Sequence, residues 1–301
     1  MDAEARVARG VALIEEAPNR LLCVVGPTAS GKTDLAIAVA ERVGGEIVSA
    51  DSVQIYRGFD IGSGKPSPEE QARAPHHLID VLDPLELVDA AAWARTAEAA
   101  IADVRARGKV PILCGGTYFW VRALVLGLVD APAGDPDIRA RHRALVEERG
   151  RQALHDELTK IDPESAKRLH PNDVVRVSRA LEIHELSGRK MSEWHAEHGF
   201  RHRRLEHAMI APSCEPDELT KRIAARVDHW LAIGWIDEVG GLLAKGYGEA
   251  RAMGSVGYKE VRAHVEGQLA RESLRDAIVQ STRIFARRQR TWLKQAAVEW
   301  L

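Results

Sequence analysis

The sequence predicts an α/β protein in which a parallel sheet carries helices on both faces and is interrupted by a mostly helical insert domain. Three observations lead to this prediction. Short apolar runs alternate with helical patterns up to about residue 130, as is typical of buried parallel strands. From about 131 to 204 the pattern is helical and basic, with few strand signals. Polar clusters follow the apolar runs, and parallel sheets bind ligands at the carboxyl ends of their strands.

The elements are expected in the following order. Apolar runs predict strands at 21–26, 46–51, 76–81, 109–116 and, after the insert, 207–212. Helical periodicity or Ala-rich composition predicts helices at 34–43, 89–107, 216–233, 235–246 and 271–299. The predicted domains are a polar N-terminal leader helix (1–20), an α/β core with C-terminal helices (21–130 and 205–301) and the helical insert (131–204).

The composition is that of an ordinary globular chain. Its 301 residues include 42 Lys and Arg against 44 Asp and Glu, and 45% are hydrophobic. This excludes a disordered or collagen-like protein, and no apolar stretch approaches the roughly 18 residues that suggest a membrane span. Residues 1–20 lack the apolar region of a secretory signal, and the three cysteines form neither a disulfide set nor a zinc motif. We therefore expect a cytoplasmic protein without a membrane partner, and a monomer.

A phosphate-binding loop follows the first predicted strand. The segment GPTASGKT fits G-x-x-x-x-G-K-[ST] at every fixed position, between a strand and a helix. Glycines let backbone amides surround a di- or triphosphate, Lys32 adds a full charge, and the Thr33 hydroxyl is placed for Mg²⁺. The core is therefore expected to be P-loop NTPase-like, and the strand–helix context disfavours a chance match. The expected anion-binding residues are Gly26, Pro27, Thr28, Ala29, Ser30, Gly31, Lys32 and Thr33.

Further motifs follow in a fixed order along the chain. They are ADSVQIYRGFDIG from residue 50, PHHLID from 75, GGT from 115, RVSRALE from 176, GYKE from 257 and TRIFARRQRTW from 282. With the phosphate loop, this set spans residues 22–300 and resembles the tRNA dimethylallyltransferases (tRNA isopentenyltransferases, the IPP transferase family). At the three positions after GGT the family usually has a small or flexible residue followed by Leu-Tyr, whereas this chain has Tyr118-Phe119-Trp120. The resemblance therefore does not predict the shape of the prenyl pocket.

The resemblance implies a reaction and a donor site. A dimethylallyl group passes from dimethylallyl diphosphate to the exocyclic amine (N6) of the adenosine next to the anticodon (position 37) of tRNA, and diphosphate is released. Lys32, Mg²⁺ and nearby arginines are implied to stabilise the charge of the leaving group. In the helix at 216–233, Arg222 matches the diphosphate-contacting arginine of the family better than Arg226, and a solvated basic surface is the alternative.

The resemblance also implies the groups at the acceptor. Asp51 is implied as the base that accepts a proton from the amine. The alternative roles for Asp51 are a turn cap and a water-mediated contact with Mg²⁺. Thr117 is implied to contact the leaving group, and the alternative is that it is an ordinary polar loop residue. A loop base must be flipped out to be read, so the segment formed by Asp51, Ser52, Val53 and Gln54 is expected to line its pocket, with Gln54 reading the base.

A basic ridge is predicted on the C-terminal helix. Residues 277–298 contain five Arg and Lys and no acid. Arg283, Arg287 and Arg290, with Lys294, recur on one helix face, where they could follow the phosphates of a tRNA anticodon stem-loop. Solvation is the alternative. The opposite stripe is expected to pack on the core and consists of Ile278, Thr282, Phe285, Gln289, Trp292 and Ala296.

In the insert, Arg139, Arg176 and Arg179 match positions of the family that contact tRNA. A second group, Arg201, Arg203 and Arg204, could extend this patch. Three other functions stay open: an adenylate isopentenyltransferase acting on free AMP, ADP or ATP, a P-loop nucleotide kinase, and a non-catalytic RNA-binding P-loop module. The basic helix and the large insert favour a polynucleotide acceptor.

Overall fold

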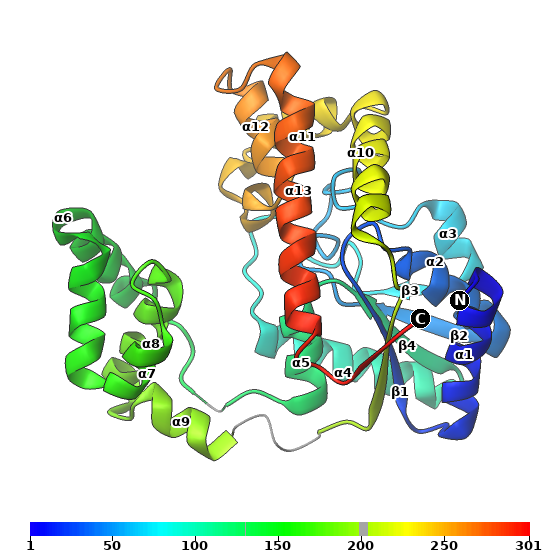
Figure 1. Cartoon of the computed structure of the whole chain (residues 1–301), viewed down its shortest axis with the longest axis horizontal. Coiled ribbons are helices and arrows are strands. Elements are labelled where there is room, and N and C mark those ends of the chain that lie inside the picture. Colours follow the sequence, from blue (N-terminus) through cyan, green and yellow to red (C-terminus); the bar gives the residue numbers. More distant parts are fainter. Residues whose placement is uncertain (130, 199–203) are drawn as a thin grey trace. The chain divides into compact units, whose positions relative to one another are not determined.

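The computed structural model describes residues 1–129, 131–198 and 204–301 (Figure 1). The chain forms two compact units. Unit 1 contains residues 1–125 and 204–301, and unit 2 contains residues 126–203. Unit 1 carries the sheet, and the described part of unit 2 is helical. Within the described ranges, no helix is long and apolar enough to cross a membrane.

A six-stranded sheet in the order β3-β2-β4-β1-β5-β6 forms the centre of unit 1. Each pair of neighbouring strands is parallel. In β1, Leu22 lies opposite Ile112 on one side and Ala208 on the other, so the loop that follows β1 leaves the middle of the sheet. The strands are β1 (Leu21–Val25), β2 (Gly45–Ser49), β3 (His76–His77), β4 (Val110–Gly115), β5 (His207–Ala211) and β6 (Val298–Trp300).

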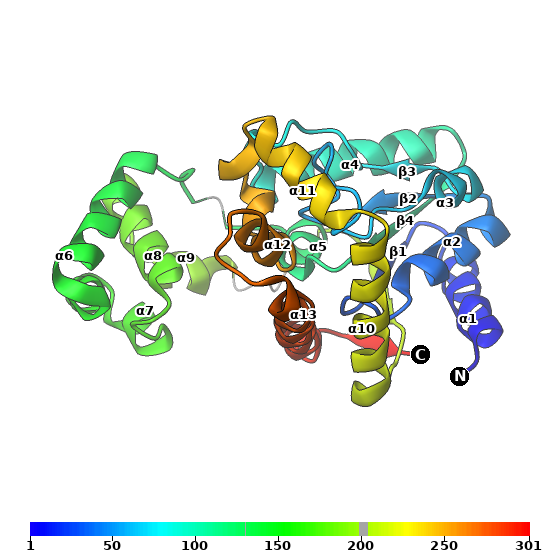
Figure 2. The same cartoon turned by 90° about the horizontal axis from the view of Figure 1, so that it is seen from above.

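Helices cover both faces of the sheet. Seen from above, α4 lies on one side of the strands and α1 and α2 lie on the other (Figure 2). The predicted α/β fold class is confirmed. The helices of unit 1 are α1 (Ala3–Glu16), α2 (Lys32–Val43), α3 (Pro68–Arg73), α4 (Ala90–Ala106), α5 (Tyr118–Leu126), which ends at the boundary with unit 2, α10 (Pro216–Ala232), α11 (Trp235–Ala244), α12 (Tyr258–Val265) and α13 (Arg271–Leu293), with 3₁₀ turns η1 (Tyr247–Glu249) and η2 (Arg251–Gly254). Those of unit 2 are α6 (Pro136–Ile161), α7 (Pro163–Arg168), α8 (Val174–Ser187) and α9 (Met191–His198).

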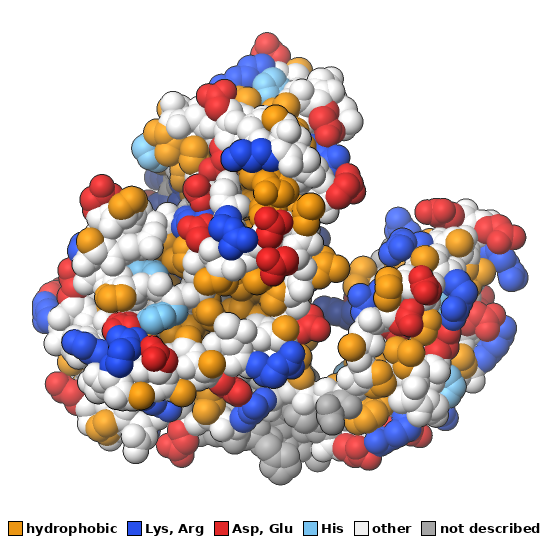
Figure 3. Space-filling view, turned by 180° about the vertical axis from the view of Figure 1, so that it is seen from behind, with side chains coloured by type: hydrophobic (Ala, Val, Ile, Leu, Met, Phe, Trp, Pro, Cys, Tyr) orange, Lys and Arg blue, Asp and Glu red, His pale blue; other side chains and the backbone are white. Residues whose placement is uncertain are grey.

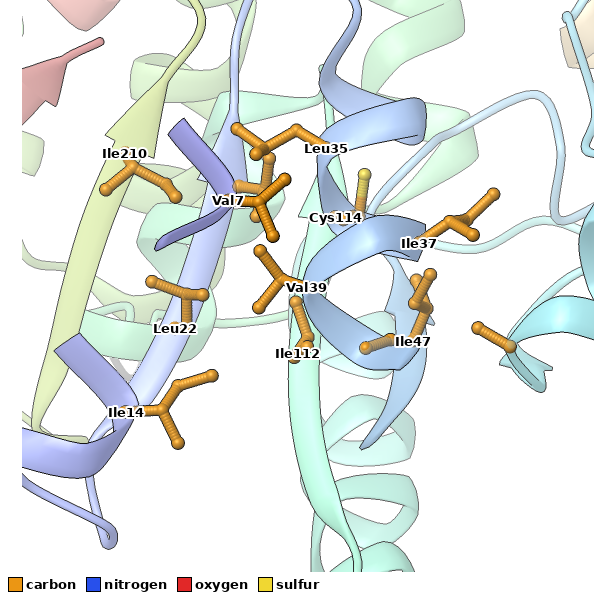
Figure 4. Close-up of a cluster of buried hydrophobic side chains, with 14 of the residues drawn as sticks. Val7, Ile14, Leu22, Leu35, Ile37, Val39, Ile47, Ile112, Cys114 and Ile210 are labelled. Atoms are coloured by element: carbon orange, nitrogen blue, oxygen red, sulfur yellow. The ribbon is translucent and has the colours of Figure 1, made fainter. Parts of the chain in front are cut away.

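A hydrophobic core cluster lies between the sheet and helices α1 and α2 (Figure 4). Val39 of α2 and Ile47 of β2 are almost completely buried, and full burial of such a side chain stabilises by about 1.5–3 kcal/mol. Helix α1 adds Val7 and Ile14 to the same cluster. The N-terminal segment is therefore helical, as expected, but it belongs to the core: two helical turns separate its two apolar positions, which places them on one face.

Two predicted elements differ in extent from the observed ones. The strand predicted at 76–81 is reduced to β3, because Leu78 and Asp80 have φ angles of 64° and 56°, outside the extended region. The helix predicted to reach residue 299 ends at Leu293, and β6 then pairs with β5 at the edge of the sheet. Free backbone groups of an edge strand are available for such pairing, which helical periodicity cannot reveal.

A buried carboxylate explains part of the PHHLID segment. Glu46 of β2 accepts hydrogen bonds from Arg107 at 2.5 and 2.7 Å and lies 2.6 Å from His77 Nε2. The Arg107 guanidinium, with a smaller contribution from His77, lowers the pKa of Glu46 to about 2 despite its burial. His77 is thus a structural partner of the strand.

Candidate active site

A cavity of about 490 Å³ lies in unit 1, where the phosphate loop after β1, the segment after β2 and the turn after β4 come together. Helices α10, α11 and α13 also contribute to its wall. Lys32, Asp51 and Thr117, which the sequence analysis singled out on three separate segments, all line it. Parallel strands bring such residues together because their carboxyl ends share one edge of the sheet.

The phosphate loop has a conformation that requires its first and last glycines. Gly31 caps α2 with a φ of 85°. A Cβ on Gly26 would lie 2.7 Å from Ser30 Oγ, so a side chain there would displace the buried Ser30. Because α2 begins at Lys32, the first amides of the helix and the positive end of its dipole lie at the cavity and favour an anion.

The electrostatics of the cavity also favour an anion. Burial lowers the pKa of Lys32, and the nearby Arg226 adds to this effect, whereas Asp51 opposes it. Burial likewise lowers the pKa of Arg226. The side chains of Lys32 and Arg226 therefore bring two positive charges close together in a partly desolvated part of the cavity. A phosphate group bound between them would neutralise this charge.

Asp51 and Thr117 are linked through the start of the segment after β2. Asp51 Oδ1 accepts hydrogen bonds from the amides of Val53 at 2.9 Å and Gln54 at 3.3 Å, which is the turn cap named as the alternative to a base. Thr117 Oγ1 accepts from the Ser52 amide at 3.1 Å, and the Thr117 amide donates to the Ala50 carbonyl at 3.1 Å. Because a carboxylate has two acceptor oxygens, the cap does not prevent Asp51 from accepting a proton.

Gln54 has a different environment from the one expected. Its side-chain amide donates to the carbonyls of Ser63 and Gly64 at 3.1 and 3.0 Å. Both donors of this amide are therefore used to hold the loop at 60–65. In the structure, the Gln54 side chain holds this loop in place and does not have the geometry expected for hydrogen bonding to a base.

The predicted arginine on α10 is not the one in the cavity. Arg222 is 47% exposed and pairs with Glu218 at 2.9 Å, whereas Arg226 lines the cavity. Its guanidinium lies 3.4 Å from Thr28 Oγ1 and 5.4 Å from the centre of the Trp230 ring. One helical turn separates the two arginines, and only the position of the phosphate loop beside α10 distinguishes them.

Three aromatic side chains take part in the lining of the cavity. Trp230, Trp235 and Phe285 line it. A Cβ on Gly62 would lie 2.2 Å from Trp235 Nε1, so only glycine allows the loop to approach this ring. Glu238 accepts hydrogen bonds from the amides of Asp60 and Ile61 at 3.1 and 2.7 Å and so also holds this loop in place.

The side chains next to Thr117 divide between core and surface. Trp120 is buried and stacks on Trp93 with ring centres 5.0 Å apart, whereas Phe119 is exposed. Burial raises the pKa of Tyr118. None of this trio is among the residues found to line the described cavity. The departure from the family pattern after GGT therefore lies beside the cavity and not in its lining.

Gln289 is a site residue that the sequence analysis missed. It was assigned to the core stripe of the C-terminal helix, and it is indeed buried. Its side-chain oxygen accepts a hydrogen bond from the Thr28 amide at 2.9 Å, and its nitrogen donates to the Gly116 carbonyl at 3.0 Å. The sequence signal for this role was the presence of a polar residue, Gln289, in the mostly apolar stripe of the C-terminal helix.

The basic ridge is present on α13. Arg283 and Arg287 are exposed and Arg290 is half-buried. The opposite stripe differs from the prediction, because Phe285 and Trp292 are 39% and 45% exposed. The buried side of this helix consists of Leu274, Ile278, Ala286, Gln289 and Leu293. Both signs of charge are interspersed over the face of the protein shown in Figure 3.

The arginines of unit 2 have partners of their own. Arg139 lies 2.8 Å from one oxygen of the buried Glu182, and Arg179 pairs with the other. Burial would raise the pKa of Glu182, but hydrogen bonds from the two arginines and from the Asp135 amide together lower the pKa. Arg139 and Arg179 therefore neutralise a buried charge, a role that the sequence analysis did not foresee. Arg176 is 61% exposed and pairs with Asp173.

The last predicted patch is only partly described. Arg204 pairs with Glu98 at 3.0 Å. Arg201 and Arg203 lie outside the described residues.

The fold and the cavity define a P-loop protein in which a phosphate cradle, a carboxylate and a threonine share one site. A profile described as IPP transferase matches residues 54–296, and one described as isopentenyl transferase matches residues 19–81. The chain is 63% identical to the tRNA dimethylallyltransferase of Sorangium cellulosum, over 95% of this chain and 91% of that protein. It is 44% identical to that of Geobacter sulfurreducens, over 94% and 92%. The chain therefore belongs to the IPP transferase family.

Solved structures agree with this assignment. The chain is similar to a tRNA isopentenylpyrophosphate transferase from Bacillus halodurans, with a TM-score of 0.69 and 38% identity over 94% of this chain and 89% of that chain. It is also similar to a eukaryotic dimethylallyltransferase acting on tRNA, with a TM-score of 0.80 and 27% identity over 94% and 73%. The resemblance found in the sequence is confirmed, and the chain is an enzyme of the prenyltransferase class.

Proposed function

We propose that the protein transfers a dimethylallyl group from dimethylallyl diphosphate to N6 of the adenosine adjacent to the anticodon (position 37) of tRNA and releases diphosphate. The observation that carries this proposal is that a two-cation phosphate cradle, Asp51 and Thr117 line one and the same cavity. A leaving diphosphate and a proton-accepting carboxylate are the two requirements of alkyl transfer from an allylic diphosphate to an amine.

The leaving group occupies the cradle at the start of α2. As the bond between the allylic carbon and the diphosphate oxygen breaks, negative charge builds on that oxygen, and Lys32 and Arg226 stabilise it in place. The Thr117 hydroxyl, which lies 3.3 Å from Ser52 Oγ and lines the same cavity, contacts the leaving group. Arg226 takes the role that the sequence analysis gave to Arg222.

The acceptor amine loses a proton as it forms the new bond to carbon. Asp51 accepts that proton, while its cap on the Val53 and Gln54 amides keeps the carboxylate fixed. The Asp51–Gln54 segment lines the adenine side of the cavity. Gln54 contributes by holding the loop at 60–65, and the nearby aromatic wall offers surfaces on which a flipped base can stack.

The residues at the cradle fit a magnesium ion. No group of three or more His, Cys, Asp or Glu able to hold a metal occurs among the described residues. Mg²⁺ usually keeps several waters and binds through one or two protein groups together with substrate phosphates, and the Thr33 hydroxyl at the cavity suits this mode. When bound, the ion neutralises charge on the diphosphate.

A direct assay tests the proposed function. The protein is incubated with dimethylallyl diphosphate, Mg²⁺ and tRNA that lacks the modification, and the tRNA is then analysed by mass spectrometry. We expect the mass of one dimethylallyl group on N6 of adenosine 37. Parallel reactions with AMP as acceptor and with ATP as a phosphoryl donor test the adenylate isopentenyltransferase and kinase alternatives. Turnover of either without prenylation of tRNA would refute the proposal.

We further propose that the anticodon stem-loop binds along α13. Exposed Arg283 and Arg287 lie on the same helix as Phe285 and Gln289, which line the cavity. Phosphate contacts on one side of the helix would thus place an extruded base near the other. With tRNA as its substrate, the enzyme is proposed to act in the cytoplasm, as a monomer.

Replacing both Arg283 and Arg287 by Ala is expected to weaken tRNA binding about tenfold. The slope of log Kd against log salt should fall by about two, because roughly one counterion is released per phosphate contact. Fluorescence anisotropy at several salt concentrations measures both. Arg275→Ala on the same helix is the control, since this arginine is already paired with Asp228 at 2.6 Å. An unchanged salt slope in the double variant would remove α13 from the interface.

A further inference from the structure

We infer that Gln289 is a positioning residue that sets the phosphate loop at a fixed distance from the turn carrying Thr117. This inference rests on the proposed function. Gln289 does not itself need to touch a substrate. It acts through the two backbone segments that its side-chain amide joins, the phosphate loop at Thr28 and the glycine pair at Gly116.

The two hydrogen bonds use both ends of one amide. The Thr28 amide donates to Gln289 Oε1 at 2.9 Å, and Gln289 Nε2 donates to the Gly116 carbonyl at 3.0 Å. These contacts span 261 and 173 residues of sequence. Because Gln289 is buried, leaving either group of its side-chain amide unpaired would carry a desolvation penalty. The distance between the two segments is therefore strongly constrained.

The local packing is shaped around this amide. A Cβ on Gly116 would lie 2.7 Å from Gln289 Nε2, so only glycine admits the side chain at this distance. One turn away on the same helix, Ala286 packs in a buried cluster with Ala29 of the phosphate loop. Helix α13 thus holds the loop through both an apolar contact and a hydrogen bond.

The consequences reach the reacting groups. Thr117 follows Gly116 directly, and it holds the segment after β2 through the Ser52 amide at 3.1 Å. A continuous path thus runs from the phosphate cradle through Gln289 to the turn of Thr117 and on to the segment of Asp51. A second consequence concerns the cradle: the Thr28 amide is committed to Gln289, so this amide is not one of those that surround the diphosphate.

Two substitutions separate the positioning role from simple packing. Gln289→Met keeps the shape of the side chain and removes both hydrogen bonds. Gln289→Glu keeps an acceptor for the Thr28 amide and loses the donor to Gly116. For each we expect kcat to fall about 10- to 100-fold, as displacements of about 1 Å at a reacting pair do. The Kd for tRNA should stay within about twofold, because the ridge on α13 is untouched.

The affinity for inorganic pyrophosphate gives a readout independent of catalysis. Calorimetric titration should show weaker binding to both variants, because the phosphate loop is no longer held. Gln280→Met, at an exposed position on the same helix, is the control and should match the unsubstituted protein. If the variants lose thermal stability but keep kcat and pyrophosphate affinity at a permissive temperature, Gln289 only packs and the inference is wrong. If the unsubstituted enzyme transfers no dimethylallyl group, the proposed function fails, while the pyrophosphate titration still tests Gln289.

Discussion

Asp51→Asn is expected to lower kcat by about three orders of magnitude while the Kd for tRNA stays within about twofold. General base catalysis contributes about 10²- to 10⁴-fold, and an amide cannot accept the proton of the adenine amine. The amide oxygen can still accept hydrogen bonds from the Val53 and Gln54 amides, which Asp51 Oδ1 now accepts. The fold of this segment should therefore survive. Single-turnover transfer to tRNA measures the chemical step.

Asp51→Ala is the matching variant, because it removes the base and the turn cap together. If Asp51 is the base, Asn and Ala should lose similar amounts of activity, and only Ala should also lower the melting temperature. If Asp51 serves only as a cap, Asn should stay active and Ala should not. This second pattern would refute the proposed mechanism.

Local patterns were sufficient to predict most of unit 1. The predicted strands from 21 to 26 and from 109 to 116 are short, mostly apolar runs beside glycine turns, a pattern that is typical of buried strands. The phosphate loop could be found because its chemistry lies within eight consecutive residues. Asp51 and Thr117 could be grouped with it because each follows a strand of a parallel sheet.

The sequence could not predict which residues of α10 and α13 line the cavity, because this depends on packing between segments that are far apart in the chain. Arg222 and Arg226 lie on the same side of α10, and only the path of the phosphate loop places the second at the cavity. Gln289 has the spacing of a core residue, and its two partners are far away in sequence. Phe285 shares that spacing, but it faces the cavity because α13 borders it.

Gln54 shows the limit of arguing from the position of a motif. It follows Asp51 by three residues at the expected edge of the sheet, which suggested contact with the base. The structure instead satisfies its amide with two carbonyls of the loop at 60–65. Side chains near a site often serve its loops, because buried backbone carbonyls need partners.

Arg226→Ala is expected to lower kcat/KM for dimethylallyl diphosphate by about 100- to 1,000-fold. Removing one fixed donor from a site that stabilises developing charge has effects of this size. Arg226 also contacts Thr28 of the phosphate loop and lies over Trp230, so Arg226→Lys should restore only part of the loss: an ammonium keeps the charge but not the planar donor geometry.

Arg222→Ala provides the matched comparison, because this arginine lies on the same helix and is paired with Glu218 at 2.9 Å. Its kcat/KM should stay within about twofold of the unsubstituted enzyme, since an exposed ion pair contributes little. Initial rates at varied dimethylallyl diphosphate and saturating tRNA measure both variants under the same conditions. The reverse order, with a large loss for Arg222→Ala and a small one for Arg226→Ala, would return the diphosphate contact to the residue favoured by the family pattern.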